Sequence, residues 1–290
     1  MNAQPRPLMM AAVGAILLGC GALLWLARDL LAAPGTVASR PTLLELLEEV
    51  RNSGRKPPAQ TRPAPRPPAQ VRWTSPLGRA CPAVDLEMVA HLNGAQARIQ
   101  AMTAREPIHP TNFGDRFSED AYGNVIDPKP TLIVLHETVY GIGSAINTFK
   151  TPHPRDEDQV SYHTLIAENG QVVEVLDPLR RAFGAGYSAF NGEWVITNPE
   201  VGGSVNNFAL HLSMETPIDG EDAEPRHSGY SDAQYDAAAI VMAQWMRRFD
   251  IPAERITTHR HIDLGAARAD PRSFEWRKLH VRLAALGVAC

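Results

Sequence analysis

Three histidines and one aspartate stand near the ends of predicted strands, and these residue types can hold a metal ion. His136 ends an apolar run, His259 and His261 follow a short predicted strand, and Asp270 comes eleven residues after His259. A catalytic zinc site needs three protein ligands and an open position for water, and two histidines with one carboxylate satisfy that need. The spacing alone does not separate such a site from histidines in ordinary hydrogen bonds, because the helical HExxH pattern is absent.

The region from residue 81 to 290 contains the elements that must position these side chains. Hydrophobic and β-branched runs predict strands at 131–138, 162–167, 171–176, 207–216 and 255–258, the second and third forming a hairpin about Asn169-Gly170. Helices are predicted at 85–102, 232–249 and 274–286, with a capping box formed by Ser231 and Gln234. Segment 105–129 is predicted to be a loop. The pattern predicts an α/β fold with a mixed central β-sheet flanked by helices.

The first 33 residues are predicted to be a membrane anchor or signal segment. Nineteen residues from Met9 to Ala27 carry no charge, and about 20 apolar residues span a bilayer as a helix. An uncleaved anchor, a lipoprotein signal at Cys20 and a cleaved signal peptide ending near Ala33 all fit this run. Each would place the following domain outside the cytoplasm, so the expected location is membrane-anchored or exported, on the periplasmic or cell-wall side.

Residues 34–80 are predicted to be a short helix followed by a proline-rich linker. Leucines in 42–54 predict the helix, and six prolines fall between Pro57 and Pro68 among basic residues. Such a stretch favours extended polyproline II and predicts a semi-rigid spacer before a domain at 81–290. A ligand for a proline-binding partner and a basic contact with anionic lipid or wall polymer are the alternatives.

Composition narrows the classes of function. Hydrophobic residues make up 44% and charged residues 21% of the chain, which is typical of a protein with a globular core. The net charge of -4 argues against a nucleic-acid-binding protein. Three cysteines are too few for a disulfide scaffold. Cys81 and Cys290 flank the globular region, so either a bond that joins the two ends of the domain or two unpaired thiols is expected.

Five motifs in order resemble the type-2 N-acetylmuramoyl-L-alanine amidases, a family that includes the phage lysozyme-type amidases and the peptidoglycan recognition proteins. They are VLHET, SYHTLIAENG, NFALHLSMETP, THRHID and RADPRSFEW. The resemblance covers residues 131–286, and it is specific because all five motifs occur in the family's order.

The resemblance implies a zinc ion held by His136, His259 and Asp270. Two neighbouring family positions differ, because Thr258 and Arg272 stand where the family has glycine. His261 competes with His259 for the second ligand position. In a strand these two histidines would share a face, because successive side chains alternate.

The resemblance also implies auxiliary catalytic residues. Tyr162 matches a family tyrosine whose phenol would donate to the oxyanion formed at the amide carbon, although a packing role is the alternative. Arg268 lies two residues before the aspartate, where lysine is common, and its charge would also face the oxyanion.

The general base does not transfer directly from the family motif. Ser213 occupies the position of the family's glutamate, and Glu215 lies two residues further on, where it would project from the same face. Glu215 is therefore the predicted base, and Glu137 is its rival, although alternation should turn Glu137 away from His136. Gly184 stands where the family has a substrate-facing histidine, so contact with the substrate must differ there.

The implied activity is zinc-dependent hydrolysis of the amide bond between N-acetylmuramic acid and L-alanine in peptidoglycan. Zinc would polarise the carbonyl and lower the pKa of water to about 7. Two other functions stay open: a peptidoglycan-binding module with weak or no catalysis, and a zinc hydrolase of another amide or peptide. The expected partners are a peptidoglycan or muropeptide substrate and, through the N-terminal segment, a membrane, with no nucleic acid.

Overall fold

A six-stranded sheet forms the centre of the computed structural model, which describes residues 61–78 and 80–290. The strand order is β1-β5-β4-β9-β3-β10, and every neighbouring pair is parallel except the antiparallel pair β4-β5. The strands are β1 (Ala104–Arg105), β3 (Leu132–Glu137), β4 (Thr164–Ile166), β5 (Val172–Glu174), β9 (Ala209–Met214) and β10 (Ile256–Thr258). The predicted mixed sheet and its hairpin at β4-β5 are confirmed.

Two smaller sheets and five α-helices complete the described part of the chain. Strand β2 (Phe113–Asp115) pairs with β6 (Arg180–Ala182), and β7 (Val195–Asn198) pairs with β8 (Gly202–Ser204). The helices are α3 (Leu86–Met102), α4 (Ile142–Lys150), α5 (Asp232–Phe249), α6 (His259–Ile262) and α7 (Trp276–Ala285). Single 3-10 turns lie at Pro76–Gly78, Pro110–Asn112, Asp156–Asp158, Ile218–Gly220 and Ala253–Arg255.

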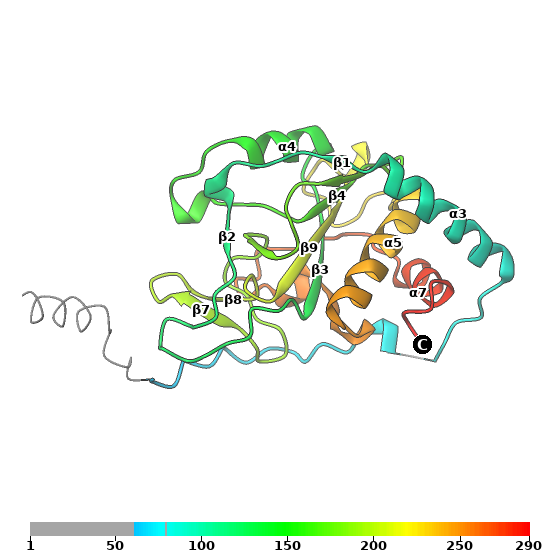
Figure 1. Ribbon diagram of the computed structural model, residues 1–290. Helices are drawn as coiled ribbons and strands as arrows, with labels where there is room; N and C mark the ends of the chain where they lie inside the picture. The colour runs from blue at the N-terminus through cyan, green and yellow to red at the C-terminus, as the bar shows by residue number, and fades with distance from the viewer. Residues whose placement is uncertain (1–60, 79) are drawn as a thin grey trace, which may run out of the picture. The chain divides into compact units, whose positions relative to one another are not determined.

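Helices cover both faces of the sheet, as alternation along the strands requires (Figure 1). Ile133 and Leu135 of β3 pack with α3, α5 and α7 in the largest apolar cluster. On the opposite face, Phe149 of α4 packs against Leu165 and Val173. Because side chains alternate along a strand, the face that carries α4 is also the face onto which His136 projects.

Local sequence signals account for three of the helices. Asp85 accepts a hydrogen bond from the Met88 N–H and caps α3, and both halves of the predicted capping box at Ser231 and Gln234 are present at the start of α5. The last helix is also confirmed, with ends that differ by one or two residues from the prediction. Helix α4 was not predicted, because its N-cap is Gly141 and no side chain caps it.

The region predicted to be a loop before the first central strand contains β2. Its three residues pair with β6, far away in the sequence. A strand this short shows no alternation that sequence analysis could detect, so its existence depends on the partner strand.

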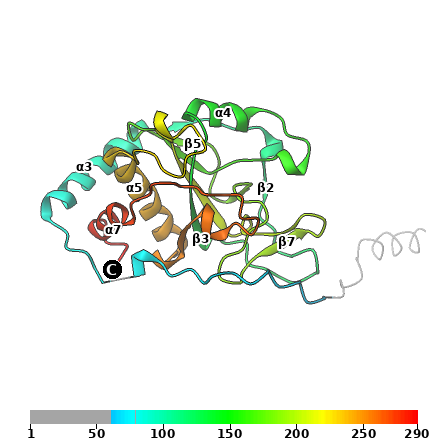
Figure 2. The ribbon, with the colours of Figure 1, turned by 180° about the vertical axis from the view of Figure 1, so that it is seen from behind.

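Part of the proline-rich segment lies along the domain. Trp194 Nε1 donates a hydrogen bond to the Pro65 carbonyl at 2.9 Å, and Gln70 Nε2 donates to the Ala189 carbonyl at 3.0 Å. The compact unit accordingly begins at Gln60. From residue 61 onward, the segment predicted to be a spacer is therefore held against the domain by hydrogen bonds; Figure 2 shows it running along the lower edge of the domain towards the C-terminus.

The expected membrane location needs correction. The predicted anchor at 9–27 and the predicted helix at 42–54 lie outside the described residues. Within 61–78 and 80–290, no helix combines the length and the apolar character needed to cross a bilayer. The expectation of a membrane-anchored or exported domain therefore finds no support in the described residues.

A disulfide joins the two ends of the domain. Cys81 and Cys290 are bonded, with their Cα atoms 5.7 Å apart and a sequence separation of 209. This Cα separation falls within the usual range for a disulfide. Of the two expectations for these cysteines, the bond is confirmed.

We expect thiol labelling of the unreduced, denatured chain to find one free thiol, because Cys20 is the only cysteine outside the bond. Reduction, or replacement of both Cys81 and Cys290 by serine, should lower the free energy of unfolding by roughly 5 kcal/mol on the chain-entropy model. The Cys81→Ser variant is the control, since it should free Cys290 and raise the count to two. Three free thiols in the unreduced wild type would contradict the bond.

Candidate functional site

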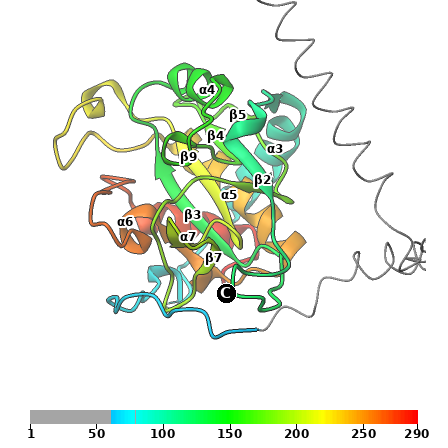
Figure 3. The same cartoon turned by 90° about the vertical axis from the view of Figure 1, so that its left-hand side faces the viewer.

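Parallel pairing of β3 and β10 brings His136 and His259 together. The register places Leu135 opposite Thr258, so the residues that follow each of them lie side by side at the carboxyl edge of the sheet. His136 is fully buried and His259 is 6% exposed. Figure 3 shows α6, which begins at His259, beside β3. Polar side chains at this edge of a parallel sheet meet where such folds commonly bind ligands.

Asp270 completes the set from the loop after α6. Its Oδ2 lies 3.2 Å from His136 Nδ1 and 3.1 Å from His259 Nδ1. The ligand atoms of the three residues all lie within 4.8 Å of one another. The Arg260 N–H donates to the Asp270 carbonyl at 3.0 Å and fixes the loop against α6. The structure therefore brings together the three residues that the sequence predicted as a ligand set.

The protonation states of His136 and Asp270 favour the binding of a cation. Burial lowers the pKa of His136 to about 4, so this imidazole is neutral at neutral pH. Burial would raise the pKa of Asp270, but hydrogen bonds with His136 and His259 hold it well below its usual range. Neutral imidazole and ionised carboxylate are the protonation states that a metal needs. Two imidazole nitrogens and one carboxylate oxygen are a donor set that fits zinc.

His261 does not join the set, and the interpretation that it shares a face with His259 is wrong. The two residues lie on α6, a single helical turn, in which side chains two positions apart point about 200° apart around the axis. His261 Nδ1 lies 2.5 Å from Thr258 Oγ1, and its ring packs on Trp73 with centroids 4.2 Å apart.

Of the two predicted oxyanion-stabilising residues, Tyr162 contacts the ligand set of His136, His259 and Asp270 directly, whereas Arg268 is exposed to solvent. The Tyr162 ring stacks on His136, with centroids 4.3 Å apart. Burial, followed by the charge of Asp270, raises the pKa of Tyr162, so its phenol keeps its proton. Arg268 is exposed, and Asp263 accepts a hydrogen bond from its backbone N–H at 2.8 Å. Its charge is a small contributor, after burial, to the lowered pKa of His136.

Glu137 faces away from His136, as alternation predicted. Its carboxylate accepts hydrogen bonds from Arg272 Nε at 2.5 Å, the Arg272 N–H at 2.8 Å and the Tyr230 hydroxyl at 2.5 Å. His227 Nε2 lies 3.2 Å from the same carboxylate. Glu137 therefore anchors the segment just after Asp270 and is not placed to act on a ligand beside His136.

Glu215 lies at the end of β9, next to the N-terminus of α4. Its Oε1 accepts the Ile142 N–H at 2.6 Å, and its Oε2 accepts the Glu168 N–H at 2.9 Å. Ser213, the residue level with His136 in β9, is buried, and its hydroxyl has no hydrogen-bond partner among the described residues. Glu215 is thus a partly buried carboxylate, and each of its two oxygens already accepts one hydrogen bond from a backbone N–H.

A row of buried histidines lies behind His136, and no sequence pattern singled it out. His136 Nε2 lies 2.9 Å from His211 Nδ1, and the rings of His211 and His163 stack with centroids 5.9 Å apart. Alternation along β9 does place His211 and Ser213 on one face, and that was the available signal. It became informative only once the register of β9 with β3 was known.

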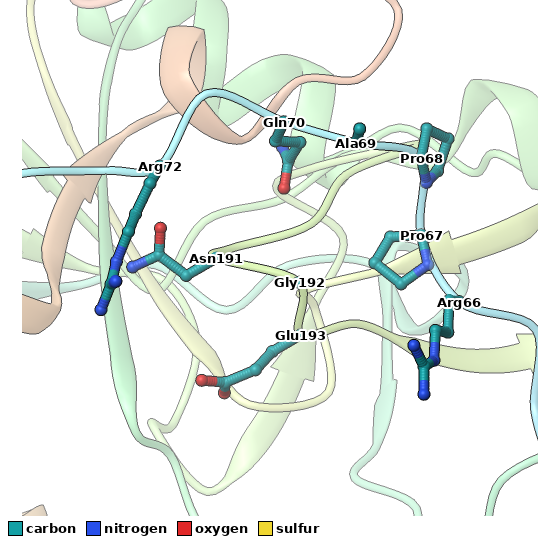
Figure 4. A pocket seen from close by; sticks show the side chains of 9 residues that line it. All are labelled: Arg66, Pro67, Pro68, Ala69, Gln70, Arg72, Asn191, Gly192 and Glu193. Carbon is teal, nitrogen blue, oxygen red and sulfur yellow. The ribbon is translucent and has the colours of Figure 1, made fainter.

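A groove of about 680 Å³ lies elsewhere on the described surface. It runs between the proline-rich segment and the turn at Asn191, Gly192 and Glu193 (Figure 4). None of the candidate site residues lines this groove.

Comparisons with known proteins agree on one family. Residues 127–273, just over half of the chain, match the family model described as N-acetylmuramoyl-L-alanine amidase. The 1,6-anhydro-N-acetylmuramyl-L-alanine amidase AmpD of Enterobacter cloacae is 28% identical over 172 residues, covering 54% of this chain and 82% of AmpD. The Citrobacter freundii protein of the same name is 29% identical over 170 residues, covering 58% of this chain and 72% of that protein.

Solved structures with a similar fold include two of related name. A crystal structure of a selenomethionine AmpD derivative aligns with a TM-score of 0.48 at 23% identity, covering 63% of this chain and 95% of that one. AmpDh3 from Pseudomonas aeruginosa, in complex with anhydromuramic pentapeptide, aligns with a TM-score of 0.39 at 19% identity, covering 52% and 58%. On the family match, the chain belongs to the N-acetylmuramoyl-L-alanine amidase family.

Proposed function

We propose that this chain hydrolyses the amide bond between N-acetylmuramic acid and L-alanine in peptidoglycan or its fragments, using zinc held by His136, His259 and Asp270. The observation that carries the proposal is the convergence of these three ligand atoms within 4.8 Å at the carboxyl edge of the sheet. Membership of the amidase family and the activity in the names of the two curated relatives support the substrate class.

The ligand set determines what a bound ion would contribute. A zinc ion there would polarise the amide carbonyl and make water a better nucleophile near neutral pH. His136 and His259 would bind through Nδ1, because these are the atoms that face Asp270. The burial of both histidines keeps the site dry enough for such electrostatic effects to be large.

Tyr162 and Arg268 would stabilise the negative charge that develops on the carbonyl oxygen. The raised pKa of Tyr162 keeps its phenol protonated, so it can donate a hydrogen bond to that oxygen. The Arg268 guanidinium would supply a positive charge and several N–H donors. As an exposed residue it would approach the oxygen from the solvent side.

Glu215 would accept the proton of the attacking water and return it to the leaving amine. It lies on the face of the sheet that carries α4, whose Phe149 packs against the same Tyr162 ring that stacks on His136. Each carboxylate oxygen has two lone pairs. The bonds to Ile142 and Glu168 therefore orient Glu215 and leave one lone pair on each oxygen for a proton.

We expect the purified chain to contain about one zinc ion, held by the three-ligand set. Chelation should abolish hydrolysis, and added zinc should restore it. The His136→Ala variant should lose both the metal and the activity, measured by elemental analysis and by product release. His261→Ala is the matched control, because this histidine lies on the same short helix but contacts Trp73 instead, and it should keep both. Full zinc and activity in His136→Ala would refute the assignment.

Digestion of purified peptidoglycan and of anhydro-muropeptides identifies the bond that is cut. We expect muramic acid free of peptide, together with stem peptides that begin with a free L-alanine amine, detected by mass spectrometry. Cleavage inside the stem peptide would indicate a zinc hydrolase of another bond. Binding to peptidoglycan with no new amine would indicate a binding module instead.

Glu215→Gln should keep zinc bound while turnover falls about 10²-fold or more, because the amide cannot accept the proton. The substitution also places an NH₂ group against one of two backbone N–H donors, so thermal stability must be measured alongside turnover. Glu221→Gln is the matched control, since Glu221 accepts the Gly141 N–H at 3.0 Å at the same end of α4. It should lose stability similarly but keep turnover. Equal turnover losses in both variants would show that Glu215 only supports the helix end.

A further inference from the structure

Behind His136 lies a buried histidine that the proposed reaction does not use. His211 is fully buried in β9, and its Nδ1 is 2.9 Å from His136 Nε2. We infer that His211 is a positioning residue that fixes His136 in the tautomer and orientation of a metal ligand, and that Gly184 provides the space for the His211 ring. This inference depends on the proposed function, because it concerns the same metal site.

The hydrogen bonds determine which ring nitrogen of His136 carries the proton. Nδ1 of His136 faces Asp270 and would bind the metal through its lone pair. A neutral imidazole then carries its proton on Nε2. That N–H points at His211 Nδ1, which must accept it. The partner of a ligating histidine commonly fixes the tautomer and the ring orientation in this way.

His211 is itself held in position by its strand and by His163. The His211 backbone N–H donates to His163 Nδ1 at 3.0 Å, so the proton of His163 resides on Nε2. That Nε2 donates to the Arg180 carbonyl at 3.2 Å. The rings of His163 and His211 are parallel within 2°. The two histidines are thus fixed relative to the backbone of β9.

Packing gives no other reason for a histidine at position 211. Its Nε2 is buried and has no hydrogen-bond partner among the described residues. The hydrogen bond with His136 is therefore the side chain's one polar contact in the described part of the chain. A buried imidazole with an unsatisfied N–H is costly, and its presence here is explained if the bond to His136 is functionally required.

Gly184 leaves the space that the His211 ring occupies. A Cβ built on Gly184 would lie 2.4 Å from both Cγ and Nδ1 of His211. The ring is fully buried, so a side chain at 184 could be accommodated only if the His211 ring left its present position. Position 184 is also where the chain departs from the family by lacking a histidine. The absence of a side chain at 184 and the ring of His211 are thus sterically complementary.

Zinc affinity of the metal-free chain tests the inference directly. His211→Ala and His211→Leu remove the acceptor, and we expect the dissociation constant of zinc to rise about 10–100-fold in competition with a chromogenic chelator. His211→Asn places an amide oxygen near the position of Nδ1 and should restore affinity to within about threefold of wild type. The absorption spectrum of the cobalt-substituted chain should change in the Ala and Leu variants and recover in the Asn variant.

His280→Leu is the matched control, because His280 is another buried histidine whose Nε2 has no partner among the described residues. It should leave zinc affinity and the cobalt spectrum unchanged. Wild-type affinity in the Ala and Leu variants, or an Asn variant as weak as Ala, would overturn the role of His211. If the wild type itself bound no zinc, the proposed function would fail instead.

Gly184→Ala tests the second half of the inference. The added methyl group should displace the His211 ring and weaken zinc binding as much as His211→Ala does. In the His211→Ala background the ring atoms that this methyl group would meet are gone, so the double variant should bind zinc no more weakly than His211→Ala alone. A Gly184→Ala variant that binds zinc like the wild type would show that the glycine is not needed for the position of His211.

Discussion

The parallel pairing of β9, β3 and β10 is the constraint on which the candidate site depends. Six consecutive residue pairs join β3 to β9, and three join β3 to β10. Because all three strands run in the same direction, their carboxyl ends meet at one edge. A shift of one residue in the register of β3 would move His136 to the opposite face of the sheet. The apolar residues on both faces of β3 therefore fix the position of this histidine.

A second constraint positions the aspartate. Asp270 lies on a loop, which has little intrinsic order, yet its carboxylate must meet two buried histidines. Arg272, two residues further on, binds Glu137 on the opposite face of β3 from His136. Two consecutive residues of β3 therefore position the site from opposite faces of the sheet. His136 faces Asp270, and Glu137 holds the loop that carries Asp270. Breaking a buried pair of this kind by removing one partner typically costs about 3–5 kcal/mol.

Much of the fold could be predicted from the sequence, because strong local signals specify it. The hairpin at Asn169-Gly170, the capping box at Ser231 and the apolar run before His136 all produced the expected elements. Helix α4 and the single turn α6 escaped prediction, since they lack side-chain caps and their order comes from packing. The resemblance identified the ligand set. Neither it nor periodicity identified His211, because its contact with His136 depends on the register between strands.

The central claim is that His136, His259 and Asp270 hold one zinc ion. Anomalous diffraction at the zinc edge, on crystals of the zinc-loaded chain, tests it most directly. We predict a single strong peak about 2.0–2.2 Å from Nδ1 of both histidines and from a carboxylate oxygen of Asp270. A peak coordinated by His261 or His211 in place of either histidine, or no peak within reach of Asp270, would contradict the account.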